Sequence, residues 1–438
     1  MSVAAQPALE IRGARYPVVL PSVHDPRVHL AAVIVSLQIL GQAAFDFRLS
    51  IAQILISIGT CAVLEIAIVL WRQRMIMWPA SALLTGNGVA FILRVPGTEH
   101  GDWWSLHGAW IFAATAAGAL LSKHVLRLRT GHVFNPSNIG LVVCFLALGP
   151  GRADPLDFWW GPMSPALALA LAIIVVGGLV ILSRLRLLVM AVSFWLVFAA
   201  AIAVVAAAGH AMTARWHLGP IEGLRFWTVL ATSPEILVFL FFMLTDPKTV
   251  PKGRPARLVF GVAVALLAAL LIAPARTEFW AKVAVLGALA LVCAARPAVA
   301  ALAPSIKLHG RKLGVLAAAG LLVYAGALIA AGTPARSSPA APSPAARPIR
   351  LPHVEVLPSK GVDSTLDRRT ALQIAADLVA DLERRNPQAR RIPSVALWLE
   401  PGAGQGPVVV AQLDGRRGTT VEVTQSASGY GVGRIRRK

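Results

Sequence analysis

Long apolar segments separated by short polar turns fill most of the chain. A helix that crosses the apolar core of a bilayer needs roughly 20 residues, with a usable range of about 17 to 25. The apolar segments therefore predict eleven membrane helices. They lie near 28–45, 51–71, 76–94, 105–122, 134–150, 164–183, 187–208, 224–245, 256–273, 279–295 and 313–332. Gly, Asn, Pro or charged residues interrupt three of them, those at 76–94, 134–150 and 224–245.

The low content of charged residues supports the same interpretation. Of the 438 residues, 56% are hydrophobic and only 14% are charged, whereas a soluble domain carries about 25% charged residues. The net charge of +20 follows the positive-inside rule. Most basic residues before 333 fall on inner segments when the N-terminus is placed in the cytoplasm. Part of the basic charge is therefore explained by topology, and we expect the protein to contact the lipid bilayer and to bind no nucleic acid.

The chain changes character after residue 332. Residues 333–352 are rich in Pro, Ala and Ser and predict an extended linker. Because eleven membrane helices precede it and the N-terminus is placed in the cytoplasm, the linker should lie outside the cytoplasm. In the segment that follows, "STLDRRTALQIAADLVADLERRN" predicts one amphipathic helix, and four strand-like runs come after it. Its expected cap is Ser364 with Asp367, and its expected apolar stripe is Leu372, Ala375, Val379 and Leu382. We expect a small α+β domain that docks a protein partner.

These patterns divide the chain into five parts. They are a cytoplasmic N-terminal segment (1–27), a membrane domain (28–295), a cytoplasmic loop with a further membrane helix (296–332), the linker (333–352) and the extracytoplasmic α+β domain (353–438).

Several ionisable and amide side chains fall inside the predicted membrane helices. Each ionisable group costs about 2.5 to 3.5 kcal/mol at the centre of a membrane helix, so such groups usually face a cavity or a partner. Glu65 and Glu235 have no evident partner in the sequence, and we predict that both line one enclosed polar cavity as an ion or substrate pathway. The predicted cofactor-binding residues are Thr85, Gly86, Asn87, Asn135, Asn138, Ser233, Glu235 and Asp246. For Ser81 and Thr85, bonding to their own helix is the alternative.

The interruptions recur with a period of five helices. Gly86 and Gly88 permit a break in the third predicted helix, and Pro234 permits one in the eighth. In transporters, broken helices at matching positions of two halves line the binding site. We therefore predict an all-α polytopic membrane fold with a ten-helix core. It consists of two inverted five-helix repeats, 28–150 and 164–295, and is followed by an eleventh helix and the tail domain.

The polar elements, taken together and in this order, resemble a known family. "SALLTG", "FNPSNIG" and "FFMLTDPKT", the last followed by "GRPARLVFG", are similar to RnfD, a membrane component of the Rnf electron-transport complex. The corresponding membrane component of the Na⁺-translocating NADH:quinone reductase belongs to the same family. The stretches "WPASALLTGNGVAFILRVPGTEHGDWWSLHG" and "DPLDFWWGPMSP" most resemble the RnfD-like membrane proteins found with enediyne biosynthesis genes.

The resemblance covers roughly 28–295. It implies ten core helices in two inverted halves, a flavin within the membrane region, and electron flow coupled to ion movement in a bacterial cell membrane. Thr85 and Gly86 match the "TG" element of the family. Asn135 and Pro136 match its "NP" element, and Thr245 to Pro247 match its "TDP" element.

The chain departs from the family at the site of flavin attachment. Members with covalent FMN attach it to a Thr in a Ser-Gly-Ala-Thr type motif, which this sequence lacks. Ser164 stands roughly where that Thr would lie, without the surrounding motif. This departure argues against covalent FMN and leaves non-covalent flavin (FMN or riboflavin) and quinone open. The tail domain is also not a usual part of this family.

Three functions therefore stay open. The first is a redox protein that works with other membrane redox proteins. The second is a cofactor-free transporter or channel for a small molecule or ion. The third is a non-catalytic membrane anchor that acts through 353–438. No nucleophile elbow, metal-ligand spacing or dinucleotide motif is present, so we predict no catalytic and no metal-binding residue. We assign His100, His107 and His124 to surface or packing roles.

Overall fold

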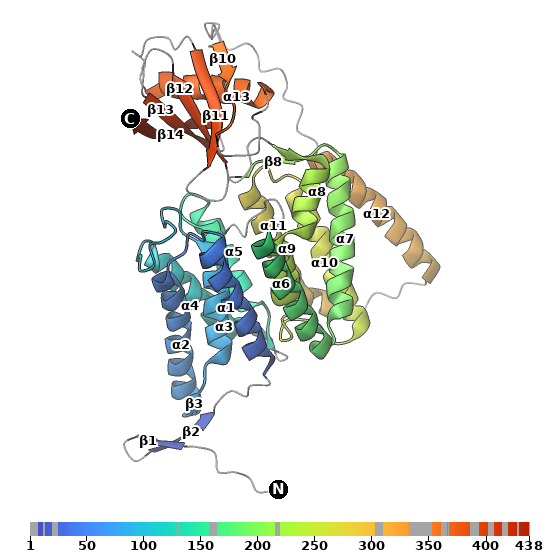
Figure 1. The fold of residues 1–438 in the computed structure, drawn as a ribbon. Helices are drawn as coiled ribbons and strands as arrows, with labels where there is room; N and C mark the ends of the chain where they lie inside the picture. The colour runs from blue at the N-terminus through green and yellow to red at the C-terminus, as the bar shows by residue number, and fades with distance from the viewer. Residues whose placement is uncertain are drawn as a thin grey trace. The chain divides into compact units, whose positions relative to one another are not determined.

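The computed structural model comprises two compact units (Figure 1). It describes 8–11, 14–19, 25–128, 131–156, 164–214, 220–302, 310–332, 353–360, 366, 368–385, 394–401, 407–413, 419–426 and 429–437. The first unit is helical and contains Met1–His210, Gly223–Ala275 and Phe279–Gly332. The second contains Thr333–Lys438 together with Ala211–Glu222 and Arg276–Glu278.

Every predicted membrane segment contains a helix. The helices are α1 (Pro26–Ala44), α2 (Ile51–Gln73), α3 (Ala80–Ile92), α4 (Ala109–Val125), α5 (Pro136–Leu148), α6 (Pro165–Leu185), α7 (Leu188–Ala207), α8 (Gly223–Thr232), α9 (Pro234–Val238), η1 (Phe239–Met243), α10 (Arg254–Ile272), α11 (Glu278–Leu302) and α12 (Gly310–Gly332). Among the described residues, seven helices are long and apolar enough to cross a membrane.

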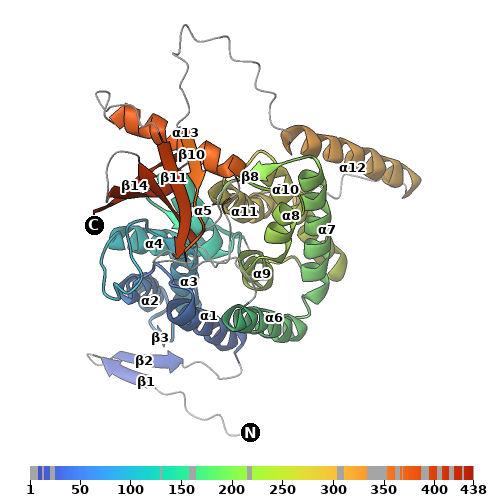
Figure 2. The same ribbon diagram turned by 45° about the horizontal axis from the view of Figure 1, so that its top comes forward.

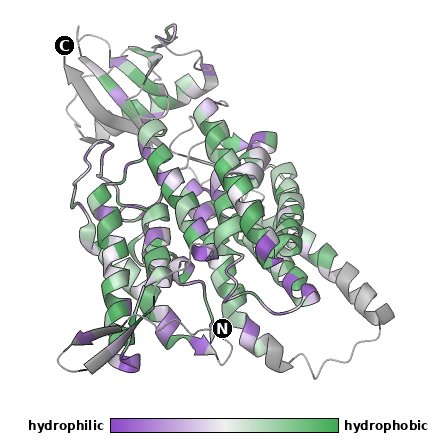
Figure 3. Ribbon diagram, turned by 60° about the horizontal axis from the view of Figure 1, so that its bottom comes forward, coloured by the Kyte–Doolittle hydropathy of each residue, from purple (hydrophilic) through white to green (hydrophobic). Residues whose placement is uncertain are grey.

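Large apolar side chains cover the outer surfaces of these helices. Val63 on α2 is 68% exposed, Val176 on α6 is 60% exposed and Leu196 on α7 is 55% exposed. Figure 3 shows the same property as long stretches of green along the helices. Exposed apolar surface of this extent is typical of a surface that contacts lipid. The helices therefore indicate a multi-pass integral membrane protein.

The predicted break in the eighth segment is confirmed. α8 ends at Thr232, and Ser233 then starts α9 by accepting a hydrogen bond from the Ile236 backbone N–H at 3.0 Å. Pro234 occupies the first turn of α9, where its missing N–H costs nothing. After α9 the chain continues as the π-helical turn η1. One predicted span is therefore three short elements.

The predicted break at Gly86 and Gly88 is wrong, because α3 runs without interruption through both glycines. A Cβ on Gly86 would lie 2.6 Å from the Ser57 carbonyl oxygen and 2.7 Å from the Ile58 Cα, both on α2. Gly86 therefore permits close approach of two helices and no change of direction. The span is instead shortened at its ends, by the strands β3 (Ile76–Met77) and β4 (Leu93–Arg94).

Short strands complete the first unit. The N-terminal segment forms β1 (Ala8–Ile11) and β2 (Ala14–Val19), which pair antiparallel, and β2 pairs in parallel with β3. β4 pairs antiparallel with β7 (Asp154–Pro155). The two-residue strands β5 (Arg127–Leu128) and β6 (Gly131–His132) form a further antiparallel pair after α4.

In chain order the helices form two groups, α1–α5 and α6–α11. Within the first group, α1 packs on α3, α2 packs on α3 and α4, and α4 packs on α5. Within the second, α6 packs on α9 and η1, and α7 packs on α8 and α10. α1 and α6 lie side by side (Figure 2) and join the groups, with Gly177 of α6 against Val33 of α1. α12 packs on α7 and α10.

The second unit is built around a five-stranded sheet in the order β10-β11-β12-β13-β14. Its strands are β10 (His353–Val356), β11 (Ser394–Pro401), β12 (Pro407–Leu413), β13 (Thr419–Ser426) and β14 (Gly429–Arg437). β10 is parallel to β11, and the other pairs are antiparallel. The same unit also contains the hairpin of β8 (Ala211–Met212) and β9 (Ile221–Glu222). The predicted α+β character of the tail is confirmed.

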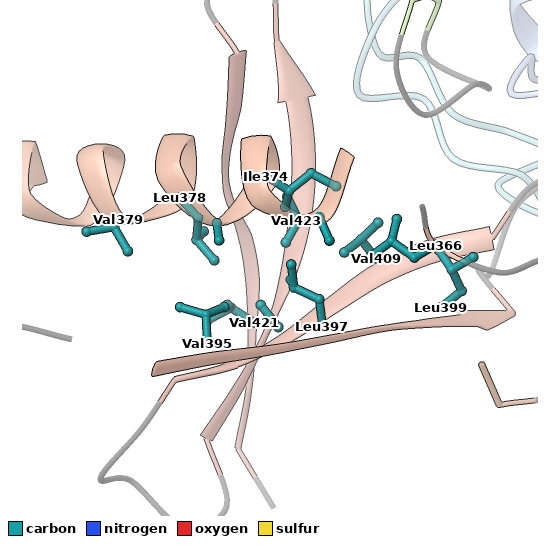
Figure 4. Close-up of a cluster of buried hydrophobic side chains, with 13 residues drawn as sticks. Leu366, Ile374, Leu378, Val379, Val395, Leu397, Leu399, Val409, Val421 and Val423 are labelled. Atoms are coloured by element: carbon teal, nitrogen blue, oxygen red, sulfur yellow. The ribbon is translucent and has the colours of Figure 1, made fainter. Parts of the chain in front are cut away.

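One face of this sheet is covered by helix α13 (Arg368–Arg385). Alternate residues of the strands, such as Val395, Leu397 and Val409, form a core with Ile374 and Leu378 of the helix (Figure 4). The predicted stripe of the helix is partly wrong, because Leu372 is 41% exposed. The buried positions of α13 are Ala371, Ile374, Ala375, Leu378 and Val379. The predicted cap residues Ser364 and Asp367 lie outside the described residues.

Candidate functional site

Glu65, which we predict to line an enclosed polar cavity, is held by two basic side chains. Its Oε1 accepts a hydrogen bond from Lys123 Nζ at 2.8 Å, and its Oε2 lies 2.7 Å from His124 Nε2. Lys123 also reaches Ser81 Oγ at 3.4 Å. Glu65 and Lys123 are both buried. The assignment of His124 to a surface or packing role is therefore wrong, since it completes a buried charged cluster.

The helix ends explain how this cluster forms. α4 extends to Val125, so Lys123 and His124 lie in its last turn, and α2 and α3 both pack against α4. Two basic residues in the last turn also suit the negative end of the helix dipole. Lys123 follows the predicted end of the fourth membrane helix at 122, whereas the structure places it within α4 as the counter-ion of Glu65.

Glu235 forms a separate ion pair in the second helix group. Its Oε1 lies 3.2 Å from Lys282 Nζ of α11, and both side chains are 14% exposed. Glu235 also occupies the first turn of α9, where a negative charge is favourable. The two acids therefore belong to different clusters, and the expectation that they lack partners is wrong.

The two amides of the "FNPSNIG" motif reach across to the second helix group. Asn135 caps α5 through its Oδ1, and its Nδ2 donates to the Met243 carbonyl oxygen at 3.3 Å. Asn138 Nδ2 donates to the Leu286 carbonyl oxygen of α11 at 3.0 Å. Both amide side chains are buried. The start of α5 is thus joined to the end of η1 and to α11 by polar contacts.

Asp246 makes two further polar contacts in the same region. Its Oδ1 accepts a hydrogen bond from the Lys248 backbone N–H at 3.0 Å, which closes the turn after η1. Its Oδ2 lies 3.4 Å from His132 Nε2, in the segment that leads into α5. Asp246 therefore closes a turn and also contacts the segment that precedes α5.

The carbonyl of Thr249, in the same turn, accepts a hydrogen bond from Arg296 of α11. We call Asn135, Asn138, His132, Asp246 and Arg296 the polar junction. Its members come from both helix groups.

Among the described residues, three buried amide oxygens have no hydrogen-bond partner, those of Gln42, Asn87 and Asn138. Asn87 and Asn138 are 4% and 1% exposed, and each is next in sequence to a residue of the contact between α3 and α5. There Ser137 Oγ donates to the Thr85 carbonyl oxygen at 3.2 Å, and a Cβ on Gly88 would lie 2.8 Å from Ser137 Oγ. Such an unpaired oxygen costs about 1–3 kcal/mol, which a ligand with hydrogen-bond donors would relieve.

The remaining predicted site residues have local structural contacts. Thr85 Oγ1 donates to the Ser81 carbonyl oxygen of its own helix at 2.9 Å. Ser233 caps α9. Ser164, at the position considered for flavin attachment, caps α6 by accepting a hydrogen bond from the Leu167 N–H at 3.2 Å. Arg94 and Asp154, which the sequence did not single out, form a buried ion pair at 2.5 Å between β4 and β7.

Comparison with known proteins found no matching family model and no similar curated protein. The long apolar helices and the buried polar clusters between them define an integral membrane protein.

Proposed function

We propose that this chain is an RnfD-like membrane protein that serves membrane electron transport or coupled transmembrane transport. The observation that carries this proposal is the polar junction. Two motifs that resemble those of that family, "FNPSNIG" and "FFMLTDPKT", are distant in the sequence and meet there, because Asn135 donates to the Met243 carbonyl oxygen and His132, two residues before the first motif, lies 3.4 Å from Asp246. Motifs that bind one ligand or lie on one pathway should meet in this way.

The helix contacts support two repeats. The contacts of α1 with α3, α2 with α3, and α2 with α4 correspond to those of α6 with α9 and η1, α7 with α8, and α7 with α10. Each group contains five spans, and an odd number inverts the second group in the membrane relative to the first. The ten-helix core with inverted halves is therefore part of the proposal.

The unpaired oxygens of Asn87 and Asn138 suit a bound redox cofactor. A flavin ring offers an N–H donor and a quinol offers O–H donors, and either could satisfy buried amide oxygens. When bound, either group supplies electron transfer. Asn87 and Asn138 would fix its orientation. Ser164 already serves as a helix cap, which agrees with a non-covalent cofactor.

The test is an absorption spectrum of the protein purified in detergent, followed by acid precipitation. We expect flavin or quinone in the supernatant. Asn138→Leu should reduce the bound cofactor. Ser183→Ala, a matched loss of one polar group at an exposed position of α6, should leave it unchanged. A colourless preparation with no extractable flavin or quinone would exclude the redox function.

A cofactor-free transporter is the second candidate. The Glu235–Lys282 pair favours it, because a partly buried acid and its counter-ion can exchange partners with a passing ion. Proton-dependent flux in vesicles without any chromophore would support this function. If deletion of 353–438 abolished function while changes at Glu235 had no effect, a membrane anchor would be the correct interpretation. The link to enediyne biosynthesis rests on the motif resemblance alone.

A further inference from the structure

Basic side chains from two separate segments meet where α6 ends and α10 begins. Arg184 and Arg186 lie at the end of α6, and Lys252 and Arg254 lie at the start of α10. Arg257 joins the two segments, because its Nη1 donates to the Arg186 carbonyl oxygen at 3.0 Å. Its Nε donates to the Pro251 carbonyl oxygen at 3.3 Å. We call these five basic residues the basic corner.

The positive charge of the basic corner is not neutralised locally. Arg184, Arg186, Lys252 and Arg254 are exposed, and across the part of the chain that the structure describes, no salt bridge involves any of the five. Arg184 Nη1 lies 3.4 Å from His29 Nδ1 of α1. The acid near His29, Asp25, is already paired with Arg27 at 2.6 Å. The two segment ends, which Arg257 joins, therefore carry four exposed basic side chains without a local acidic partner.

Exposed apolar side chains lie next to the basic corner, on α10 and at the start of α7. Leu258 lies one turn after Arg254 on the same face of α10 and is 43% exposed, and its neighbour Val259 is 64% exposed. Val189, at the start of α7, is 52% exposed. A molecule that carries both a phosphate and an apolar chain would match a basic surface with an apolar surface beside it. Guanidinium groups bind phosphate oxygens in a forked geometry.

We propose that the basic corner binds the headgroup of an anionic phospholipid, with an acyl chain lying along Leu258 and Val259. The proposal rests on the membrane location of the helices and is independent of the redox or transport function. A free phosphate ion would use the basic residues alone and would leave the adjacent apolar surface unmatched. Each basic residue near an anionic lipid contributes about 1 kcal/mol.

A matched pair of variants tests the proposal. Helix α2 ends as α6 does, with Arg72 in its last turn and Arg74 at the left-handed C-cap (φ 49°), which correspond to Arg184 and Arg186 (φ 55°). Arg184→Gln/Arg186→Asn and Arg72→Gln/Arg74→Asn therefore remove the same charges from the same helix positions. Asn is used at both C-caps because it tolerates the left-handed conformation.

The measurement is binding of phosphatidylglycerol to the full-length protein, by native mass spectrometry and by exchange into phosphatidylcholine nanodiscs that contain phosphatidylglycerol. At about 1 kcal/mol per charge, the α6 variant should bind roughly 25-fold more weakly. The α2 variant should bind as the wild type does, and both should melt at the wild-type temperature. Equal weakening in both variants, or none in the α6 variant, would overturn the proposal. Displacement of the lipid by inorganic phosphate alone would identify a simple anion site and would also overturn it.

Discussion

Asn138 Nδ2 donates a hydrogen bond to the Leu286 carbonyl oxygen, 148 positions along the chain, at 3.0 Å. This contact joins α5 of the first helix group to α11 of the second. The same residue has a buried Oδ1 without a partner among the described residues, so only one end of the amide contributes a hydrogen bond to this contact.

Replacing Asn138 with Ala should therefore loosen the junction between the helix groups. A net hydrogen bond is worth about 1 kcal/mol, and we expect a loss of that size in the free energy of unfolding in detergent. Ser137→Ala is the control, because Ser137 donates to Thr85 within the first group. Limited proteolysis should detect separation of the two groups in the Asn138 variant only. If the Asn138 variant unfolds and is cleaved as the wild type is, the contact does not hold the groups together.

Removing the charge of Glu65 should be strongly destabilising. Glu65→Gln leaves Lys123 buried without its counter-ion, and breaking a buried pair in this way costs about 3–5 kcal/mol. The double variant Glu65→Gln/Lys123→Met removes both charges and should recover most of the loss. Thermal unfolding of the three proteins in the same detergent provides the comparison. A single variant as stable as the wild type would show that the cluster is solvated.

Gly86 should be intolerant of a side chain for steric reasons. In Gly86→Ala the new Cβ would meet the backbone of α2 at Ser57 and Ile58, within 2.7 Å, and a backbone cannot rotate away as a side chain can. Overpacking of this kind costs about 1–3 kcal/mol. Gly59→Ala, on α2 itself, meets nothing within 4 Å and should be neutral or stabilising. Equal stability of the two variants would mean that α2 and α3 are not in close contact.

The N-cap of α1 makes the stability of the protein depend on pH. Asp25 accepts a hydrogen bond from the Arg27 N–H at 2.9 Å and forms an ion pair with its guanidinium, and the side-chain hydrogen bond from Arg27 lowers the pKa of the carboxyl below its usual value. Because the folded pKa is depressed, the stabilisation is present above the unfolded pKa and is lost as the pH falls through the folded pKa. Asp25→Asn keeps the cap and removes this dependence, which thermal unfolding measured across acidic pH should show. Asp25→Ala should cost about 1 kcal/mol at neutral pH.

The structure shows which features of this protein its sequence determines locally. The break at Ser233 and Pro234 was predictable, because a cap residue and a proline act on their own helix. Gly86 was misjudged because the same residue type permits either a kink or close contact, and only the neighbouring helix decides between them. Leu372 was misassigned because a stripe shifted by one residue is equally regular in sequence. In the structure, Ala371 and Ile374 are the residues buried in the core with the strands.

Charge partners could not be predicted for a related reason. Lys123 and Lys282 appeared at predicted helix ends, where positive residues are common, and nothing local distinguishes a topological lysine from a counter-ion. Their acids are Glu65 and Glu235, 58 positions away for the first pair and on a different helix for the second. Only the packing of α2 on α4 and the placement of α9 near α11 brings each pair together.

The Glu235–Lys282 pair allows a structural role to be separated from a transport role. Glu235→Gln should destabilise the protein by leaving Lys282 without its counter-ion, and Glu235→Gln/Lys282→Met should restore thermal stability by removing both charges. If Glu235 only holds α9 against α11, the double variant should recover function together with stability. If Glu235 lies on an ion pathway, the double variant should be stable, but in vesicles its flux should fall by about tenfold or more, the effect of about 1.4 kcal/mol on a rate. Measuring melting temperature and flux on the same preparations distinguishes the two roles, and recovery of both would exclude Glu235 from the pathway.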